Sequence, residues 1–291
     1  MTDDTPAADG GTATSHGHPA GARPARTRLR AVLDFAGREY RVVFRSGWPI
    51  GLALAFALLS VTVVTFGRSG LGRAGTRAVV VSLTELGVYL VPLAALAFGY
   101  GAVVEPRERG TLELLLALPV PRWVVAVGVY AGRAGALAGA LLVGFGAGGL
   151  ALFRFQGAAG WGLYLGFVAA AIALALAFLG IALAVSTLAS EKSHALGGVL
   201  LVWVWFVLVF DVLAFGLVAA VDLPPAATAG LLLANPVDVF RLFVLASAGA
   251  GAGGYGAILA AVPLDTSALA VGALAWVIAP VGLGAWLLGW R

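Results

Sequence analysis

Six long apolar runs occupy most of this chain, and short polar connections separate them. The runs lie near 48–66, 83–103, 123–152, 162–188, 196–221 and 268–289. A helix needs roughly 20 apolar residues to cross the hydrocarbon core of a bilayer, and these runs reach about that length or exceed it. The pattern predicts an all-α polytopic membrane protein with about six transmembrane helices, whose transmembrane domain covers residues 48–291.

A different pattern precedes the first apolar run. Across residues 27–47, apolar side chains recur every three or four positions, and most of the arginines fall on the opposite face, together with Asp34. Arg38 and Arg41 belong to this polar face. The spacing predicts an amphipathic helix that lies along the inner membrane surface. Residues 1–26 are rich in Ala, Gly, Thr and Pro, which favours a disordered cytoplasmic tail.

Residues 242–262 form a doubtful seventh segment. The segment is uncharged and long enough to cross a membrane, but it contains five glycines. Each glycine costs a helix about 1 kcal/mol relative to alanine. We therefore favour a re-entrant or interfacial element on the outer side over a seventh crossing. Just before it, Asn235, Pro236 and Asp238 are typical of a helix start, with Asn235 as the cap.

The positive charges indicate the orientation of the chain in the membrane. Only 11% of the residues are charged, and Lys192 is the single lysine. More arginines lie in the N-terminal region and in the second connection than in the connections on the other side. The positive-inside rule then places both termini in the cytoplasm, in a multi-pass protein of the cytoplasmic membrane. Because the arginines lie beside spans, we expect no nucleic-acid partner.

The second connection, residues 105–122, is the most polar segment between two spans. Its front half carries both signs of charge, on Glu105, Arg107, Glu108, Arg109 and Glu113. A leucine-rich stretch follows, and two prolines end the segment. The pattern predicts an amphipathic surface helix that a soluble partner could bind. An ordinary cytoplasmic loop is the alternative.

Three ionisable residues lie inside or near apolar runs, namely Glu85, Arg133 and Asp211. A charged side chain at the centre of a bilayer costs about 2.5–3.5 kcal/mol on insertion scales. These residues should therefore be paired, protonated or in contact with water. Our hypothesis is that Arg133 pairs with one of the two acids and that the set lines an interior path. For Glu85, a position in the headgroup region is the alternative.

Glycines in the third span follow a four-residue spacing. The pairs are Gly128 and Gly132, Gly135 and Gly139, and Gly144 and Gly148. Two small residues four apart leave a shallow strip on one helix face, which lets a neighbouring helix approach closely. The spacing predicts close packing within the bundle or across a dimer.

The chain lacks the motifs of the common catalytic and metal-binding sites. The Lys192-Ser193 pair is not preceded by the glycines of a phosphate-binding loop, so we expect no ATPase site and no enzyme activity in this chain. Neither HExxH nor GxSxG occurs. Cu(I) prefers cysteine and methionine, and this chain has no cysteine and only Met1. We expect no metal site and no directly bound cofactor.

Taken together, residues 105–122 resemble the signature of ABC-2 type permeases. That signature has an acidic turn, Gly-Thr-Leu and a leucine-proline-arginine ending. The matching residues are Glu105, Glu108, Gly110, Thr111, Leu112, Leu115, Pro119 and Arg122. The Arg38–Tyr40 stretch resembles the N-terminal interface helix of the same family. One departure is Val129, where related permeases often carry a lysine.

A narrower resemblance rests on three further features: Glu191-Lys192, Asp211 and the run 235–241. These residues look like those of the permeases in ABC transporters that serve maturation of nitrous oxide reductase, a copper enzyme. The resemblance covers about residues 35–291. The resemblance leaves the cargo open. Copper is often linked to such systems, but without cysteine or further methionine we expect copper to be handled by partners, and a sulfur-containing species or purely mechanical signalling is at least as plausible.

The family resemblance implies an ABC-2 (type V) permease bundle that works as a homodimer. Two copies of a separate ATPase subunit would bind it, so that ATP enters only through that partner. Coupling would involve Glu105, Arg107, Glu108, Arg109, Thr111 and Glu113, and the interface helix would contribute Arg38, Glu39 and Arg41. An extracytoplasmic accessory protein would meet the outer segment at Asn235, Asp238 and Arg241.

Two other classes remain open from the sequence. One is an ABC-2 exporter of a drug, lipid or polymer, which identification of its partner proteins would distinguish. The other is an ion-driven secondary transporter, which usually shows paired broken helices in two related halves.

Overall fold

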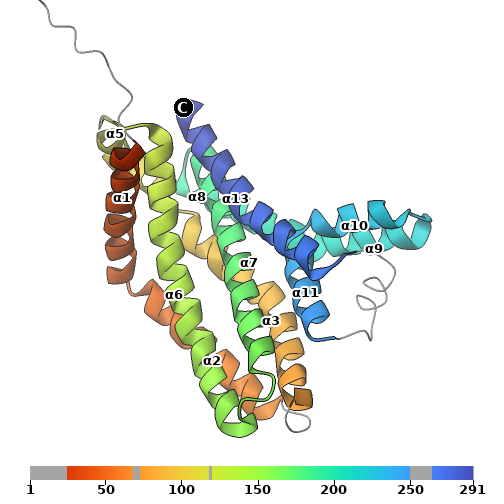
Figure 1. Ribbon diagram of the computed structural model, residues 1–291. Coiled ribbons are helices and arrows are strands. Elements are labelled where there is room, and N and C mark those ends of the chain that lie inside the picture. Colours follow the sequence, from red (N-terminus) through yellow and green to blue (C-terminus); the bar gives the residue numbers. More distant parts are fainter. Residues whose placement is uncertain (1–24, 68–72, 118–119, 250–263, 291) are drawn as a thin grey trace, which may run out of the picture.

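The computed structural model describes residues 25–67, 73–117, 120–249 and 264–290 as a bundle of helices (Figure 1). The helices are α1 (Ala25–Arg45), α2 (Trp48–Phe66), α3 (Arg73–Gly99), α4 (Val104–Glu108), α5 (Thr111–Leu116), α6 (Arg122–Gln156), α7 (Trp161–Leu188), α8 (Lys192–Val204), the π-helix η1 (Trp205–Val209), α9 (Phe210–Ala220), α10 (Pro225–Leu233), α11 (Pro236–Ser247) and α13 (Thr266–Trp290).

Six helical segments in this part of the chain are long and apolar enough to cross a membrane, as the apolar runs predict. The first of them, α2, coincides with the predicted run 48–66. By contrast, α3 begins ten residues before the predicted start at 83, because Arg73 and Arg77 belong to its first turns rather than to a loop. The fifth segment runs continuously through α8, η1 and α9.

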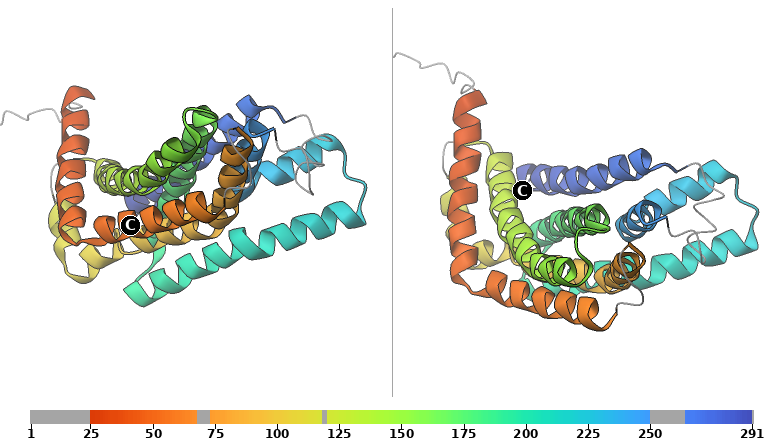
Figure 2. Two further views of the ribbon diagram at one scale, coloured as in Figure 1. Left: turned by 90° about the horizontal axis from the view of Figure 1, so that it is seen from below. Right: turned by 60° about the horizontal axis from the view of Figure 1, so that its bottom comes forward.

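Helix α1 lies crosswise to the spans at the end of the bundle where α13 also ends (Figure 2). Leu29 and Leu33 are exposed on it, whereas Glu39 and Val43 are buried against the bundle. The chain turns from α1 into α2 at Gly47, whose φ of 76° favours a residue without a side chain. This arrangement agrees with the predicted interface helix.

Helix α6 contacts α1 along its first half and α2 along its second half, and glycines occupy both contacts. A Cβ atom on Gly132 would lie 2.5 Å from the carbonyl oxygen of Ala36, and one on Gly148 would lie 2.5 Å from Cβ of Ser60. The predicted close packing is therefore confirmed for the first and third glycine pairs. Gly139 has no neighbouring atom within 4 Å of a Cβ placed there, so it makes no close contact within the chain, and close packing across a dimer stays a prediction for it.

Aromatic side chains fill the space between α2, α6, α7 and α11. The ring of Phe145 lies 5.1 Å from the rings of both Phe56 and Phe167, and Phe167 lies 6.2 Å from Phe240. The hydroxyl group of Tyr164 donates a hydrogen bond to the carbonyl oxygen of Phe145, at 2.6 Å. As a result α7 is the most buried span, with 61% of its most apolar stretch inside the protein.

Helices α10 and α11 form a bent pair with an angle of 110° between them. Arg77, in the first turns of α3, donates a hydrogen bond to the carbonyl oxygen of Gly249, just after α11. The end of α11 therefore lies beside the start of α3, at the end of the bundle opposite the α13 terminus. The doubtful segment 242–262 begins in α11, but residues 250–263 lie outside the described part, so its re-entrant course stays a prediction.

Candidate functional site

The charged segment between the second and third spans forms two short helices, α4 and α5, rather than the single helix that the sequence predicts. The break falls at Gly110, which adopts a φ of 70° and precedes α5. This left-handed conformation is strained for residues with a side chain and interrupts the helical hydrogen-bond pattern. The two short helices therefore present their side chains in different directions.

The charged side chains of α4 contact the connection between α7 and α8. Arg107 donates hydrogen bonds to the carbonyl oxygens of Thr187 and Ala189, the latter at 2.6 Å. A carboxylate oxygen of Glu108 accepts the backbone N–H of Lys192 at 2.6 Å. Glu105 forms a salt bridge with the Lys192 ammonium group. Three of the residues that were predicted to bind a partner therefore make contacts within this chain.

Helix α5 has one buried and one exposed side. Leu112 is 6% exposed and packs against the first turns of α6. On the other side, Leu114 is 71% exposed and Glu113 is exposed as well, and so is Arg109, which lies between α4 and α5. The Thr111 hydroxyl group donates to the carbonyl oxygen of Pro106, at 3.2 Å. Together with Arg109, the exposed side of α5 combines an apolar side chain with both signs of charge, as protein-binding surfaces often do.

Arg133 pairs with Glu39, and the predicted pairing with Glu85 or Asp211 is wrong. The Arg133 Nε atom lies 2.8 Å from a carboxylate oxygen of Glu39, and Nη1 donates to the carbonyl oxygen of Phe98 at 2.7 Å. Both charged side chains are almost buried, at 13% and 11% exposure. Arg133 reaches α1 because the neighbouring glycine brings α1 and α6 together. The family resemblance places Arg38, Glu39 and Arg41 in the interface helix; the Glu39 side chain is buried there, and Arg38 and Arg41 are exposed.

Asp211 belongs to a second, separate ion-pair cluster, with Asn235, Asp238 and Arg241. Arg241 Nη1 lies 3.0 Å from an Asp211 carboxylate oxygen and 3.5 Å from one of Asp238. Asn235 accepts the backbone N–H of Val237, so its predicted role as the cap of α11 is confirmed. The Asn235 side-chain amide also donates to Asp211, at 3.3 Å.

The residues predicted to dock an outer partner are buried inside this cluster. Asn235 is 0% exposed, Asp238 1% and Arg241 4%, so their side chains do not offer a binding surface, and the prediction is wrong. The three-residue spacing of Asp238 and Arg241 on one helix face was the sequence signal for an internal pair. The widened turn of η1 lies directly before Asp211, and its Phe206 carbonyl oxygen accepts the Asn235 amide at 3.0 Å.

Glu85 lies on the exposed face of α3 and belongs to neither cluster. It follows Arg77 by eight residues, which corresponds to about 12 Å along a helix. Leu86 and Tyr89 are exposed next to it. The structure therefore does not bring Glu85, Arg133 and Asp211 to one path, since each lies against different helices.

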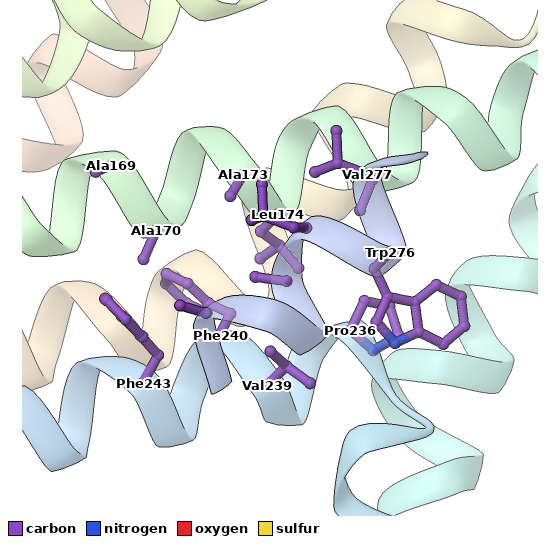
Figure 3. A pocket seen from close by; sticks show the side chains of 14 residues that line it. Ala169, Ala170, Ala173, Leu174, Pro236, Val239, Phe240, Phe243, Trp276 and Val277 are labelled. Atoms are coloured by element: carbon purple, nitrogen blue, oxygen red, sulfur yellow. The ribbon is translucent and has the colours of Figure 1, made fainter. Parts of the chain in front are cut away.

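An apolar cavity of about 320 Å³ opens between α7, α11 and α13 (Figure 3). Alanines of α7 form one wall, and Phe240 and Phe243 of α11 form another. The indole N–H of Trp276 donates to the carbonyl oxygen of Leu233 at 2.9 Å, which leaves the aromatic ring to line the cavity. Because the lining is almost wholly apolar, the cavity suits hydrocarbon rather than an ion.

Among the described residues, no three or more His, Asp or Glu side chains come together in a group that could hold a metal ion. The expectation that the chain carries no Cu(I) site among its spans stays a prediction, because it concerns the protein in the presence of copper.

The described residues combine six helical segments of membrane-spanning length with an interface helix at one end of the bundle. A pair of short charged helices follows the second span. This combination is typical of the membrane subunit of a transporter. The family described as ABC-2 family transporter protein matches residues 33–290, and the chain belongs to it. It is the permease subunit of an ABC transporter. Among known proteins it is similar to the probable ABC transporter permease protein NosY of Pseudomonas aeruginosa, with 37% identity over 265 residues, covering 88% of this chain and 96% of the relative. The probable NosY permease of Stutzerimonas stutzeri is 33% identical over 261 residues, covering 86% and 94%.

Proposed function

We propose that this permease converts ATP hydrolysis by a separate ATPase subunit into movement of its spans, in the maturation of nitrous oxide reductase. Two ATPase subunits bind a homodimer of the permease from the cytoplasm, where both termini lie. The permease either transports a cargo or transmits a mechanical signal to an accessory protein on the outer side. The similarity to NosY permeases supports the assignment to the copper-enzyme pathway.

The observation that carries this proposal is the exposed side of α5. Glu113 and Leu114 of α5, and Arg109 just before this helix, are exposed, and α5 lies between two spans at the same end of the bundle as α1 (Figure 1). A cytosolic ATPase subunit can contact this side without displacing any span. The buried side of α5, with Leu112, packs on α6 and so connects the contact to the bundle.

The homodimer is supported by a face of the bundle on which α2, α3 and α8 expose apolar side chains. Only 22% of the most apolar stretch of α2 is buried, and 17% for the span that contains α8. A groove of about 610 Å³ between α2 and α3 lies on this face. Glu85 is exposed on α3, and a carboxylate that faced hydrocarbon would cost several kcal/mol. A second copy of the chain that packs on this face, with water at the interface, keeps the Glu85 carboxylate hydrated and so removes that cost.

Docking is tested by co-purification of the permease with its ATPase subunit, in lipid nanodiscs. Glu113→Lys and Leu114→Asp should each weaken ATPase binding and lower nucleotide turnover of the complex. The matched control is Asp222→Lys, an exposed acid after α9 at the opposite end of the bundle. Unchanged binding in both α5 variants, or labelling of a cysteine at position 114 only from outside the cell, would contradict the proposal.

A further inference from the structure

Helices α4 and α5 differ in where their charges lie, although the chain joins them by only two residues. Glu113, the one charged residue of α5, is exposed to solvent, whereas Glu105, Arg107 and the exposed Glu108 of α4 form hydrogen bonds or a salt bridge with the α7–α8 connection. We call these three residues with Lys192 the α4 clamp. A loop that served only to bind an ATPase subunit would have no need of such internal contacts.

The α4 clamp holds two helix ends at once. Arg107 donates to the carbonyl oxygens where α7 ends, which carry the negative end of the helix dipole. The Glu108 carboxylate accepts a backbone N–H at the start of α8, where the dipole is positive. Glu191, which precedes α8, makes no side-chain cap of its own. Glu108 therefore caps α8 from another part of the chain.

The start of α4 also donates hydrogen bonds to α7. The backbone N–H groups of Val103 and Val104, at the start of α4, donate to the Ser186 hydroxyl oxygen of α7 at 3.0 and 3.1 Å. The ammonium group of Lys192 lies 5.5 Å from the centre of the Tyr100 ring, just after α3. These contacts connect the end of α3, the end of α7 and the start of α8.

The two helices that the clamp joins differ in how firmly the bundle holds them. In α7, 61% of the most apolar stretch is buried, but in the span from α8 to α9 the figure is 17%. The span from α8 to α9 also contains η1, and π-helical turns inside α-helices are frequent at functional sites. If the α4 clamp is displaced, α8 can therefore follow it with little loss of packing, whereas movement of α7 would disrupt many buried contacts.

We propose that α5, with Arg109 before it, provides the ATPase contact and that the α4 clamp transmits the displacement of α5 to the span α8–η1–α9. This inference deepens the proposed function and rests on it. Glu105, Glu108 and Lys192 are positioning residues that act through the start of α8 rather than through the ATPase subunit. Movement of α8 against a fixed α7 is then the first event after nucleotide binding.

The test uses the complete permease–ATPase complex in nanodiscs and compares the same substitution in the two helices. Glu108→Ala changes the clamp, and Glu113→Ala changes the exposed side of α5. Glu113→Ala should weaken ATPase binding by roughly two- to fivefold, as expected for an exposed charge pair. Glu108→Ala and Lys192→Gln should leave the binding constant within about twofold of wild type.

The second readout is the movement of α8 itself. Because the chain contains no cysteine, spin labels can be placed at Leu201 on α8 and Leu150 on α6, both more than 70% exposed. Complexes with one labelled copy among excess unlabelled copies report the distance within one chain. The ATP-dependent change in this distance should fall to less than half in Glu108→Ala and Lys192→Gln. Lys192→Arg, which keeps the pair with Glu105, should restore it.

The outcomes separate the two proposals. Binding that is insensitive to every α4 and α5 variant would contradict docking at this loop and hence the proposed function. Binding that is equally weak in Glu108→Ala and Glu113→Ala would overturn the division between the helices. An ATP-dependent distance change that persists in Glu108→Ala and Lys192→Gln would overturn transmission through the clamp, even with docking intact. The temperature of unfolding, followed by tryptophan fluorescence, identifies any variant that is simply misfolded.

Discussion

At the residue scale, the pair of Glu39 and Arg133 is the clearest electrostatic contact between the interface helix and the spans. Both side chains are nearly buried, so removing one leaves the other without its main counter-charge. Glu39→Leu or Arg133→Met should lower the free energy of unfolding by about 3–5 kcal/mol, the usual cost of breaking a buried pair. The double variant should be much less destabilised than the sum of the two. Thermal unfolding in detergent measures all three, and additive losses would show that the pair is not coupled.

A second prediction at this scale concerns the cluster around Arg241. This guanidinium group lies between the carboxylates of Asp211 and Asp238, so Arg241→Gln leaves two acids facing each other. The variant should be strongly destabilised, by about 3–5 kcal/mol. Adding Asp211→Asn should recover part of the loss, because it removes one of the opposed charges. A second substitution that destabilises further would contradict a structural role of the cluster.

At the scale of elements, the glycines of α6 control how closely α1 and α2 approach it. Gly132→Ala places a methyl group 2.5 Å from the Ala36 carbonyl oxygen, and overpacking of this kind costs about 1–3 kcal/mol. Gly139→Ala, in the same helix, meets no atom within 4 Å and should leave stability unchanged or raise it. Comparison of the two unfolding temperatures tests the contact. Equal temperatures would mean that α1 does not pack on Gly132 in the membrane.

The elements also show why some features could be predicted from the sequence and others could not. Periodicity and length identify the spans, because a helix in lipid must satisfy its own hydrogen bonds over a fixed thickness. Local residue preference predicted the cap of α11, because asparagine followed by proline is typical of a helix start. Pairing between distant helices has no such local signature, so the partners of Arg133 and Asp211 could not be derived. The break at Gly110 was also missed, since a glycine in a short charged segment is compatible with a loop, a helix or a turn.

At the scale of the whole molecule, the unevenly buried spans argue that one chain is only part of the working assembly. Span α7 is enclosed by its neighbours, whereas α2 and the span α8–η1–α9 leave most of their surface uncovered. In a bilayer, lipid can cover such apolar surface without a large cost. Lipid cannot cover Glu85 in the same way, because the carboxylate would lose its hydration. In the proposed homodimer, the position of this one acid therefore indicates which uncovered face would meet the other copy.

The homodimer prediction follows from the exposed position of Glu85 on α3. Leu86, beside Glu85 on α3, is 38% exposed, and Leu150, on α6, is 71% exposed. In the cysteine-free chain, Leu86→Cys should be joined to a second copy by a short bismaleimide in native membranes, because the face that carries Glu85 turns toward the partner. Leu150→Cys, although more exposed, should stay monomeric under the same conditions. Cross-linking at Leu150 but not at Leu86 would place the interface on α6 and leave Glu85 to face water or lipid in a single chain.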